Sequence, residues 1–308
     1  MSPDRRILIT GGAGFIGRAL ARDLGADGYE VVALTRSSSR RREPLPGTAA
    51  LAEWDGRTAA GWGGLADGAL AIVNLAGDNL AAGRWTKAKK ARILRSRVDA
   101  GSAVVEAVRA ARAKPRVLVQ ASAVGFYGPA GDEDLDEDSP PGPGFLAGVV
   151  RAWEDSTEAA GALGVRRAVI RSGLVLGKEG GVWPRLVLPF RFFAGGPLGG
   201  GRQPFSWISL EDEVRAIRHI IEHDELAGTF NLTAPGPLRQ REFCRVLGRA
   251  IRRPCWLPVP AFLLGILFGG KARETILTGQ RVLPRRLLAA GFVFRHPDAA
   301  SAVAALVR

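Results

Sequence analysis

The feature that most constrains the fold is a glycine-rich turn near the start of the chain. An apolar run of strand length, residues 6–10, leads directly into a turn at residues 11–17. Apolar residues at helical spacing follow over residues 15–24, and a second run of strand length covers residues 31–35. This order predicts a strand, a glycine turn, a helix and a second strand, which together form one βαβ unit.

The glycines of this turn follow the spacing Gly11-x-x-Gly14-x-x-Gly17. Without side chains, such a turn lets the backbone approach a pyrophosphate, and the helix that follows offers it unpaired N–H groups. We therefore expect Gly11, Gly14, Phe15, Ile16 and Gly17 to contact a dinucleotide. The alternative is a tight turn that holds no ligand, and the strand–turn–helix context disfavours it.

The end of the second strand distinguishes between the two nicotinamide cofactors. An acidic residue there would bind the ribose hydroxyls of NAD, whereas an arginine accommodates the 2′-phosphate of NADP. The sequence has Thr35-Arg36-Ser37, with no carboxylate before Glu43. Arg36 supplies a planar fork of donors and Ser37 a hydroxyl, so the prediction is NADP (NADPH). The alternative is an exposed loop arginine without a partner.

The same alternation of strands and helices continues along the chain. We expect strands at 71–75, 116–121 and 167–171, and helices at 87–112 and 145–161. The prediction is an α/β fold, with a Rossmann-type doubly wound parallel sheet and a smaller C-terminal substrate lobe. The dinucleotide-binding domain is expected at 1–177, re-entered by parts of 205–235. The smaller lobe is expected at 178–308, where glycine, proline and aromatic residues become frequent.

The charge balance of 43 basic against 30 acidic residues gives a net charge of +13. A net positive charge of this size is compatible with a nucleic-acid partner. The arginines are scattered from end to end and lysines are few, so we favour a solvated basic surface and expect no nucleic-acid partner. Cys244 and Cys255 lack the spacing of a zinc site or a disulfide framework, and no metal site is expected.

No membrane span is predicted, because the longest apolar stretch, residues 255–270, is short and interrupted by prolines. Within it, residues 262–268 could lie on a membrane or pack between lobes. They lack a Lys/Arg-rich polar face, so packing is the prediction. Residues 1–6 run straight into a strand, which leaves no room for a signal peptide, and we expect a cytoplasmic protein.

Several stretches resemble the extended short-chain dehydrogenase/reductase superfamily. Residues 10–17 resemble the opening motif of that superfamily, and Asn74-Leu75-Ala76-Gly77 resembles its fourth-strand motif. Phe126-Tyr127-Gly128 resembles its tyrosine–glycine pair. The chain is similar, more narrowly, to the atypical "epimerase family" branch (NAD-dependent epimerase/dehydratase-like). The stretches that carry this second resemblance are 54–56, 96–98, 171–177, 195–199, 206–209 and 279–284. It covers nearly the whole chain and implies a small family-specific C-terminal segment at about 255–304.

The resemblance also implies further contacts with the cofactor. Thr35 and Arg36 would hold the adenosine-phosphate end, and Arg97 would direct its charge at the phosphates. The residues expected to line the cofactor elsewhere are Leu75, Ala76, Gly77 and Leu174. Arg97 has an independent rationale, since a dinucleotide brings negative charge that a buried arginine can satisfy, and a surface helix arginine is the alternative.

The chain departs from the family pattern at the catalytic motif. Ordinary members use Tyr-x-x-x-Lys, in which the ammonium lowers the phenol pKa so that the tyrosine exchanges a proton with the substrate. Of the two tyrosines, Tyr29 and Tyr127, neither has a lysine four residues later. Phe145 and Val149 stand where the motif is expected.

The catalytic residues are therefore unknown from the sequence, and Ser122 and Tyr127 remain the candidates. Ser122 lies five residues before Tyr127, one more than the usual family spacing, and a serine at a strand end is often a turn residue. An unassisted phenol has a pKa near 10, which makes Tyr127 a poor acid–base catalyst at neutral pH.

The leading hypothesis is an NADP-dependent oxidoreductase of the atypical short-chain type that acts on an unknown carbonyl or alcohol. An alternative is a sensor or structural protein that binds NADP(H) and catalyses nothing. A nucleotide-sugar epimerase is a weaker alternative, because such epimerases need the same missing tyrosine. The expected partner is a small-molecule substrate, and the sequence leaves an oligomer open.

Overall fold

The computed structural model describes residues 5–36, 45, 47–48 and 50–307, so Ser37 lies outside the described residues. Its centre is a seven-stranded sheet in the order β12-β7-β5-β4-β1-β2-β3, in which every neighbouring pair is parallel. The strands are β1 (Arg6–Thr10), β2 (Glu30–Thr35), β3 (Ala50–Glu53), β4 (Ala71–Asn74), β5 (Val117–Ala123), β7 (Arg166–Ser172) and β12 (Gly228–Leu232). The strand order reverses between β1 and β4, which makes this a doubly wound Rossmann fold.

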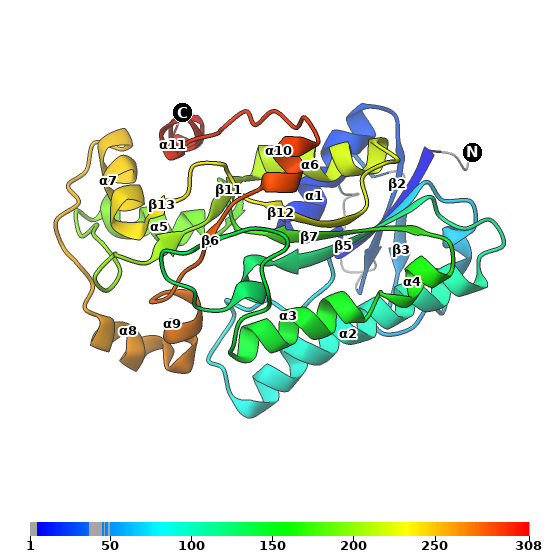
Figure 1. The fold of residues 1–308 in the computed structure, drawn as a ribbon, viewed down its shortest axis with the longest axis horizontal. Helices are drawn as coiled ribbons and strands as arrows, with labels where there is room; N and C mark the ends of the chain where they lie inside the picture. The colour runs from blue at the N-terminus through cyan, green and yellow to red at the C-terminus, as the bar shows by residue number, and fades with distance from the viewer. Residues whose placement is uncertain (1–4, 37–44, 46, 49, 308) are drawn as a thin grey trace.

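Helices cover both faces of the sheet (Figure 1). On one face α1 (Phe15–Ala26) packs against α6 (Leu210–Glu222), and on the other α2 (Lys87–Ala110) packs against α3 (Phe145–Asp155). The central strands read as unbroken apolar runs because successive side chains alternate between two buried faces. Ile7 of β1 therefore joins the α1/α6 core, while the adjacent residue Leu8 joins the α2 core.

The expected helix at 145–161 is broken in two. α3 ends at Asp155, and a short α4 (Ala159–Ala162) follows. At the break, Ser156 Oγ donates to the Trp153 carbonyl (2.6 Å), and Thr157 Oγ1 donates to the Glu154 carbonyl (3.3 Å). Hydroxyl side chains that bond nearby carbonyls in this way compete with the helical backbone. The edge strand β3 was not predicted, because four half-exposed residues carry too weak a pattern.

The smaller lobe lies at one end of the sheet (Figure 1). Its apolar core includes Trp183, Phe190, Trp207, Phe243 and Val303. The main elements around it are α5 (Trp183–Arg191), α7 (Gln240–Ala250), α11 (Ala299–Val307), β8 (Leu174–Gly177), β9 (Gly180–Gly181), β10 (Pro204–Phe205), β11 (Trp207–Ser209) and β13 (Leu238–Arg239). The remaining elements are β6 (Asp134–Leu135), β14 (Arg281–Val282), α8 (Ala261–Phe268), α9 (Gly270–Thr275), α10 (Arg285–Ala289) and the 3₁₀ helices η2 (Gly63–Ala66) and η3 (Val124–Tyr127).

The prediction that residues 262–268 pack between lobes is wrong for most of the segment. Phe262 and Ile266 of α8 are each 67% exposed and Leu267 is 62% exposed, while Leu264 is buried. The helix is apolar on all sides. A helix at the surface can bury only the side that packs against the rest of the protein, so its other apolar side chains stay exposed. Within the described part of the chain, no helix is long and apolar enough to cross a membrane.

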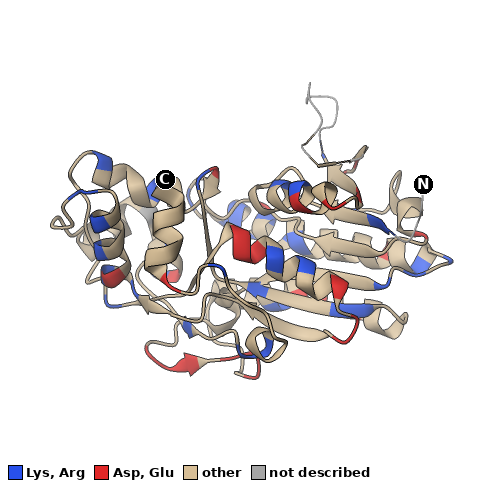
Figure 2. Ribbon diagram, turned by 90° about the horizontal axis from the view of Figure 1, so that it is seen from above, with Lys and Arg blue, Asp and Glu red and all other residues tan. Residues whose placement is uncertain are grey.

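Charged residues of both signs are interspersed along the molecule rather than gathered in a single basic stripe (Figure 2). Many surface arginines have carboxylate partners: Arg218, for example, pairs with Glu222 (2.8 Å), and Arg239 pairs with Asp132 (2.8 Å). Such a pattern is typical of a solvated surface.

Two helical glycines make a matched test of helix packing. A Cβ on Gly101 of α2 would lie 2.7 Å from Ser156 Cβ, whereas a Cβ on Gly148 of α3 would meet nothing within 4 Å. We expect Gly148→Ala to raise the free energy of unfolding by about 0.5–1 kcal/mol, because alanine loses less backbone entropy on folding. Gly101→Ala should lower it by about 1–3 kcal/mol through overpacking. Urea denaturation measures both, and equal shifts would contradict this packing.

Candidate functional site

The glycine turn lies at the carboxyl end of β1, where the strand order reverses. Gly11 has φ +66°, and a Cβ there would lie 3.0 Å from the Leu75 carbonyl oxygen. A Cβ on Gly17 would lie 2.6 Å from the Gly11 carbonyl oxygen. The positive φ and the tight contact with the chain after β4 favour glycine at position 11. At position 17 a side chain would collide with the backbone of the turn.

The start of α1 is open to an anion. Gly14 is its N-cap residue; no side chain caps the helix, and the first turn carries no acidic residue. The Gly14 amide itself donates to the Gly11 carbonyl (2.8 Å), which closes the turn. The amides of Phe15, Ile16 and Gly17 then have no acceptor within the helix, as at any helix N-terminus. Such a group of amides with a positive dipole end is suited to a phosphate.

A row of buried polar side chains holds the turn beside β4. Thr10 Oγ1 donates to Asn74 Oδ1 (2.6 Å) and accepts from the Ala76 amide (3.2 Å). The Asn74 side-chain amide donates in turn to Gln120 Oε1 on β5 (2.8 Å). The three side chains are fully buried, and each finds a partner in the row. This network fixes the backbone of Leu75 and Ala76 next to Gly11.

Arg97 of α2 reaches the same edge of the sheet. Its side chain is buried and lies over the Trp153 ring, with Cζ 4.8 Å from the ring centroid. A Cβ on Gly77 would lie 3.0 Å from Arg97 Cζ, so the guanidinium passes directly beneath the backbone after β4. Nη1 donates to the carbonyls of Ile93 (3.0 Å) and Asp78 (3.2 Å), which are neutral groups.

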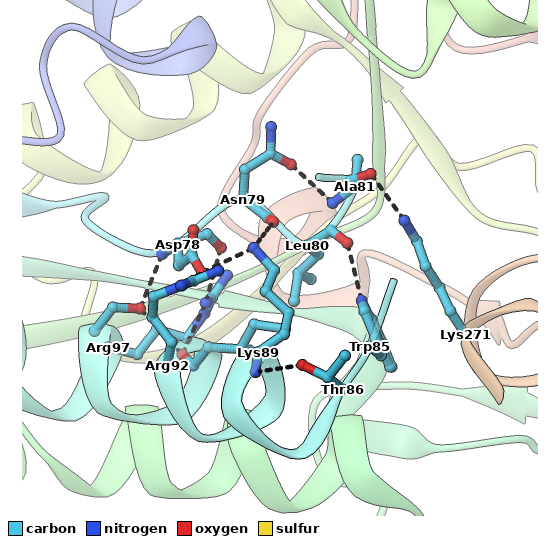
Figure 3. Close-up of polar contacts among 12 residues, drawn as sticks. Asp78, Asn79, Leu80, Ala81, Trp85, Thr86, Lys89, Arg92, Arg97 and Lys271 are labelled. Atoms are coloured by element: carbon cyan, nitrogen blue, oxygen red, sulfur yellow. Dashed lines mark hydrogen bonds and ion pairs between the residues drawn. The ribbon is translucent and has the colours of Figure 1, made fainter. Parts of the chain in front are cut away.

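The carboxylate nearest to Arg97 is committed elsewhere. Asp78 Oδ2 accepts from Lys89 Nζ (2.8 Å) and Arg92 Nε (2.9 Å) (Figure 3). Burial opposes ionisation of Asp78, but these two hydrogen bonds outweigh it and lower its pKa. Burial lowers the pKa of Arg97 to about 10, while the Asp78 charge opposes this. Arg97 therefore stays charged at neutral pH, with no carboxylate at ion-pair distance among the described residues.

Thr35 and Arg36 lie at the carboxyl end of β2. The Thr35 carbonyl accepts from the Trp54 amide (3.0 Å), which brings the stretch 54–56 alongside. The aliphatic part of Arg36 runs over Gly56, where a Cβ would lie 3.5 Å from Arg36 Cδ. Arg36 is exposed, and its guanidinium makes no hydrogen bond or ion pair with any described residue. Leu174 begins β8, and its amide donates to the Ser206 carbonyl (2.9 Å).

Ser122 and Tyr127 belong to one buried network that joins β5, α3, β7 and β12. Ser122 Oγ donates to Glu154, and Arg171 binds both oxygens of this carboxylate (2.9 and 3.0 Å). Arg171 also donates to the Tyr127 hydroxyl (3.0 Å), which donates to Asn231 Oδ1 (2.7 Å). Burial raises the pKa of Tyr127, although Arg171 opposes this. Each hydroxyl is engaged, and a catalytic role for either remains a prediction.

Comparison with known proteins identifies the family to which this fold and glycine turn belong. A model described as the NAD dependent epimerase/dehydratase family matches residues 7–233. The chain belongs to the NAD-dependent epimerase/dehydratase family. A domain of unknown function (DUF1731) matches residues 259–306, so the chain carries the small C-terminal domain that the resemblance implied.

The relatives of this epimerase/dehydratase-family chain match it over nearly its full length. The Arabidopsis thaliana protein named Epimerase family protein SDR39U1 homolog, chloroplastic, is 40% identical and covers 98% of this chain and 86% of its own. The Homo sapiens Epimerase family protein SDR39U1 is 34% identical, covering 98% and 99%. A crystal structure of human SDR39U1 (isoform2) with NADPH has a TM-score of 0.89 at 35% identity and covers 98% and 99% of the two chains.

This epimerase/dehydratase-family chain has no proton donor at the position expected for the family tyrosine. Phe145 is the first residue of α3, and its ring packs edge-on against Trp85, with centroids 5.5 Å apart. Lys90 Nζ lies 4.6 Å from the Phe145 centroid. Val149 is buried one turn later. A phenylalanine and a valine can shape a site here, but neither can transfer a proton.

Sequence reasoning missed two residues of α9 that reach this place. Lys271 Nζ donates to the Ala81 carbonyl (2.9 Å), and Glu274 Oε2 accepts from the Leu146 amide at the start of α3 (2.9 Å). Lys271 is 190 residues away from its partner in the chain, so no local pattern could link them. The family-specific segment thus binds both sides of the position where the tyrosine was expected.

Sequence reasoning also missed Glu213 of α6, which is fully buried below the end of β7. Ser172 Oγ donates to Glu213 Oε1 (2.6 Å), and Oε2 has no partner. Burial raises the pKa of Glu213 to about 8, although the hydrogen bond from Ser172 opposes this. At neutral pH this carboxyl group is mostly protonated, and in the unfolded chain it is ionised.

The raised pKa of Glu213 makes stability depend on pH. The contribution of Glu213 to the free energy of unfolding is fully present below the pKa of the unfolded chain, near 4.5. It is lost as pH rises to the pKa of the folded protein, about 8. In the wild type, we expect the free energy of unfolding to fall by about 1.4 kcal/mol per pH unit across this window. Glu213→Gln cannot ionise, so the variant should not show this fall. Denaturation at pH 5, 6.5 and 8 measures it. Parallel pH profiles for the wild type and the variant would contradict the assignment.

The ion pair between Glu154 and Arg171 gives a second stability test. Glu154→Gln leaves the Arg171 guanidinium buried without a counter-charge, so we expect the free energy of unfolding to fall by about 3–5 kcal/mol. Glu158→Gln, at an exposed position on the same segment, is the matched control and should change it by no more than about 0.5 kcal/mol. Similar losses from both variants would refute a special role for the buried pair.

Proposed function

We propose that this protein binds NADPH and acts as an oxidoreductase of the atypical short-chain type on a carbonyl or alcohol substrate. The observation that carries the cofactor choice is Arg36. Its guanidinium has no partner among the described residues, lies beside Gly56 at the end of β2, and has no acidic neighbour in the positions that NAD binding would use. The human relative crystallised with NADPH supports the same choice.

Each cofactor-binding residue has a task that follows from its chemistry. The open amides at the start of α1 and the buried Arg97 charge would hold the pyrophosphate, since both offer positive charge close to glycine backbone. Arg36 would bind the 2′-phosphate. Leu75, Ala76 and Gly77 would line the cofactor through their backbone, and Leu174 would contact its nicotinamide side.

The cofactor, when bound, supplies a hydride for reduction of a carbonyl, or accepts one from an alcohol. The protein contributes position and electrostatics. Phe145 cannot give the accompanying proton, and the hydroxyls of Ser122 and Tyr127 have buried partners. The proton would therefore come from water or from a group that the substrate itself brings to the site.

The same facts favour a second candidate, a protein that binds NADPH for sensing or structure without turnover. A nucleotide-sugar epimerase is a weaker third candidate. A Corynebacterium glutamicum structure described as a nucleoside-diphosphate sugar epimerase has 32% identity and a TM-score of 0.75, and it covers 98% of this chain and 58% of its own. Against epimerisation stands Phe145 in place of the tyrosine that such enzymes use.

We propose that residues 1–177, with parts of 205–235, form the dinucleotide-binding domain. Residues 178–308 would form the substrate lobe. The inclusion of β12 (Gly228–Leu232) in the main sheet supports the re-entry. A cytoplasmic location stays a prediction, because one relative is named chloroplastic.

Replacing Arg36 by Asp tests the phosphate assignment. The substitution puts a carboxylate near the 2′-phosphate, so we expect NADPH affinity to fall by about 100-fold or more, equivalent to about 3 kcal/mol, while NADH affinity changes little. Fluorescence titration of both cofactors measures this. Arg112→Asp, at an exposed position after α2, is the control and should leave both affinities unchanged. Equal losses for NADPH and NADH would refute the assignment.

Replacing Arg97 by Met tests a different part of the same site. Both cofactors share the pyrophosphate, so we expect NADPH and NADH affinities to fall together, by about 10-fold or more. Thermal denaturation of the unliganded variant checks that it folds. A loss confined to NADPH would move Arg97 to the 2′-phosphate, and no loss would make it a structural residue.

Turnover separates the enzyme from the sensor. Purified protein with NADPH and a panel of aldehydes, ketones and keto acids should oxidise NADPH with at least one of them, followed by the fall in nicotinamide absorbance. Tight NADPH binding without turnover across the panel would favour the sensor.

A further inference from the structure

We infer that the smaller lobe docks on the surface of an anionic lipid bilayer. The docking surface consists of the exposed apolar side chains of residues 188–193 and 256–267, together with a hollow lined by arginines of residues 245–253. This surface is separate from the cofactor site, so the inference does not depend on the proposed function. It concerns contact with one face of a bilayer and not a membrane span.

The first observation is that exposed apolar side chains gather at one end of the molecule. Among the described residues twelve large apolar side chains are exposed, and nine of them lie in residues 188–193 and 256–267. Phe192 is 74% exposed and Trp256 is 65% exposed. Figure 1 shows α5, α7 and α8 at this same end. Large exposed apolar patches mark sites of contact with a partner or a membrane.

Direct contacts join the end of α5 to the chain between α7 and α8. Trp256 Nε1 donates to the Phe193 carbonyl (2.9 Å). The amides of Trp256 and Leu257 both donate to the Gly195 carbonyl (3.0 and 3.1 Å). Arg253 lies over the Phe193 ring, with Cζ 4.5 Å from the ring centroid. The aromatic side chains and this arginine therefore form one continuous surface.

The second observation is a hollow of about 410 Å³ that adjoins this surface and brings four arginines together. Its lining consists of Arg245, Gly248, Arg249, Arg252, Arg253, Pro254 and Cys255. No carboxylate is among these lining residues. Guanidinium groups bind phosphate oxygens through pairs of hydrogen bonds, so a hollow of this composition is complementary to phosphate headgroups.

The third observation is the backbone at the two helix ends beside the surface. Phe193 has φ +59° and Arg252 has φ +54°, and in the described part of the chain no other residue except glycine has a positive φ. Each follows the end of a helix, where glycine is the usual residue. Both side chains are exposed, so packing within the chain does not explain these strained residues. Contact with a partner outside the chain does explain them.

The combination of side chains favours a lipid surface over a nucleic acid. At a bilayer, aromatic and aliphatic side chains enter the boundary between headgroups and acyl chains, while basic side chains bind anionic headgroups. Residues 262–268 lack a basic face of their own, and the arginines of the hollow supply the charge from α7 and the chain after it. Bases of a nucleic acid would stack on the aromatic rings but would leave Ile266 and Leu267 without a partner.

A second copy of the chain is the competing occupant, and its charges do not complement the hollow. Its acidic run lies at residues 132–138, and four of these carboxylates already have arginine partners. The pairs are Asp132 with Arg239, Asp134 with Arg281, Asp136 with Arg285, and Asp138 with Arg286. Two such hollows would also repel each other, since both are positively charged.

The apolar part of the surface is tested by a double variant and a matched control. Phe192→Ser combined with Phe262→Ser removes exposed rings from the end of α5 and from α8. Leu288→Ser combined with Val293→Ser removes two exposed apolar side chains elsewhere and is the control. All four side chains are exposed, so we expect the melting temperatures to stay close to that of the wild type.

The basic part is tested in the same way. Arg252→Gln combined with Arg253→Gln removes two charges from the hollow. Arg109→Gln combined with Arg112→Gln removes two exposed charges at the end of α2 and is the control. Because both double variants change the net charge equally, a difference between them reports on the hollow and not on the overall charge of the protein.

The experiment sediments the whole chain with vesicles of phosphatidylcholine, either alone or with about 30% phosphatidylglycerol. We expect the wild type to bind the anionic vesicles, and about 0.5 M salt to weaken this binding by screening the headgroups. Each of the two site variants should bind these vesicles at least about 10-fold more weakly. Both controls should match the wild type.

Failure of the wild type to bind anionic vesicles would overturn the inference. Equal losses from the arginine variant and its control would do so too, because they would attribute binding to net charge alone. Unchanged binding of the ring variant would also overturn it. Dimerisation without vesicle binding, measured by analytical ultracentrifugation and abolished in the ring variant, would assign the surface to a second copy instead.

Discussion

The close approach of the glycine turn to the backbone after β4 is the constraint on which the site depends. A Cβ on Gly11, which has φ +66°, would lie 3.0 Å from the Leu75 carbonyl oxygen, and a Cβ on Gly17 would lie 2.6 Å from the Gly11 carbonyl oxygen, so both positions favour glycine. The buried row of Thr10, Asn74 and Gln120 holds the two segments in register by hydrogen bonds. Because these strands are parallel, their carboxyl ends share one edge, and everything that can meet a ligand is brought to it.

Several cations lie near that edge. Some have no carboxylate partner, and Lys89 and Arg92 share one. Arg36, Arg97 and Lys271 make no ion pair with a described carboxylate, and Arg97 and Lys271 are also buried. Asp78, in the loop after β4, pairs with Lys89 and Arg92. A row of positive groups with little negative charge of its own suits a ligand with several anionic groups.

At the position where the family tyrosine is expected, the structure has packed apolar side chains. Phe145 fills the expected tyrosine position against Trp85, and the remaining candidate hydroxyls are tied to Glu154 and Asn231. From the C-terminal segment, Lys271 donates to the Ala81 carbonyl and Glu274 accepts from the Leu146 amide at the start of α3.

The sequence by itself determined the βαβ unit, the glycine turn and most strand positions. These depend on local spacing: apolar runs, glycine offsets and helical periodicity extend over a few residues, and Arg36 follows its strand directly. The cofactor contacts of Gly77 and Arg97 were expected from family resemblance and remain proposals, whereas the closeness of the two residues is seen only in the structure. Only the tertiary structure decided the break at Ser156, the exposure of α8, the engagement of Ser122 by Glu154, and the contact of Lys271 with Ala81. Each of these depends on which distant segment packs alongside, and a single sequence carries no periodic signal for a contact between residues far apart in the chain.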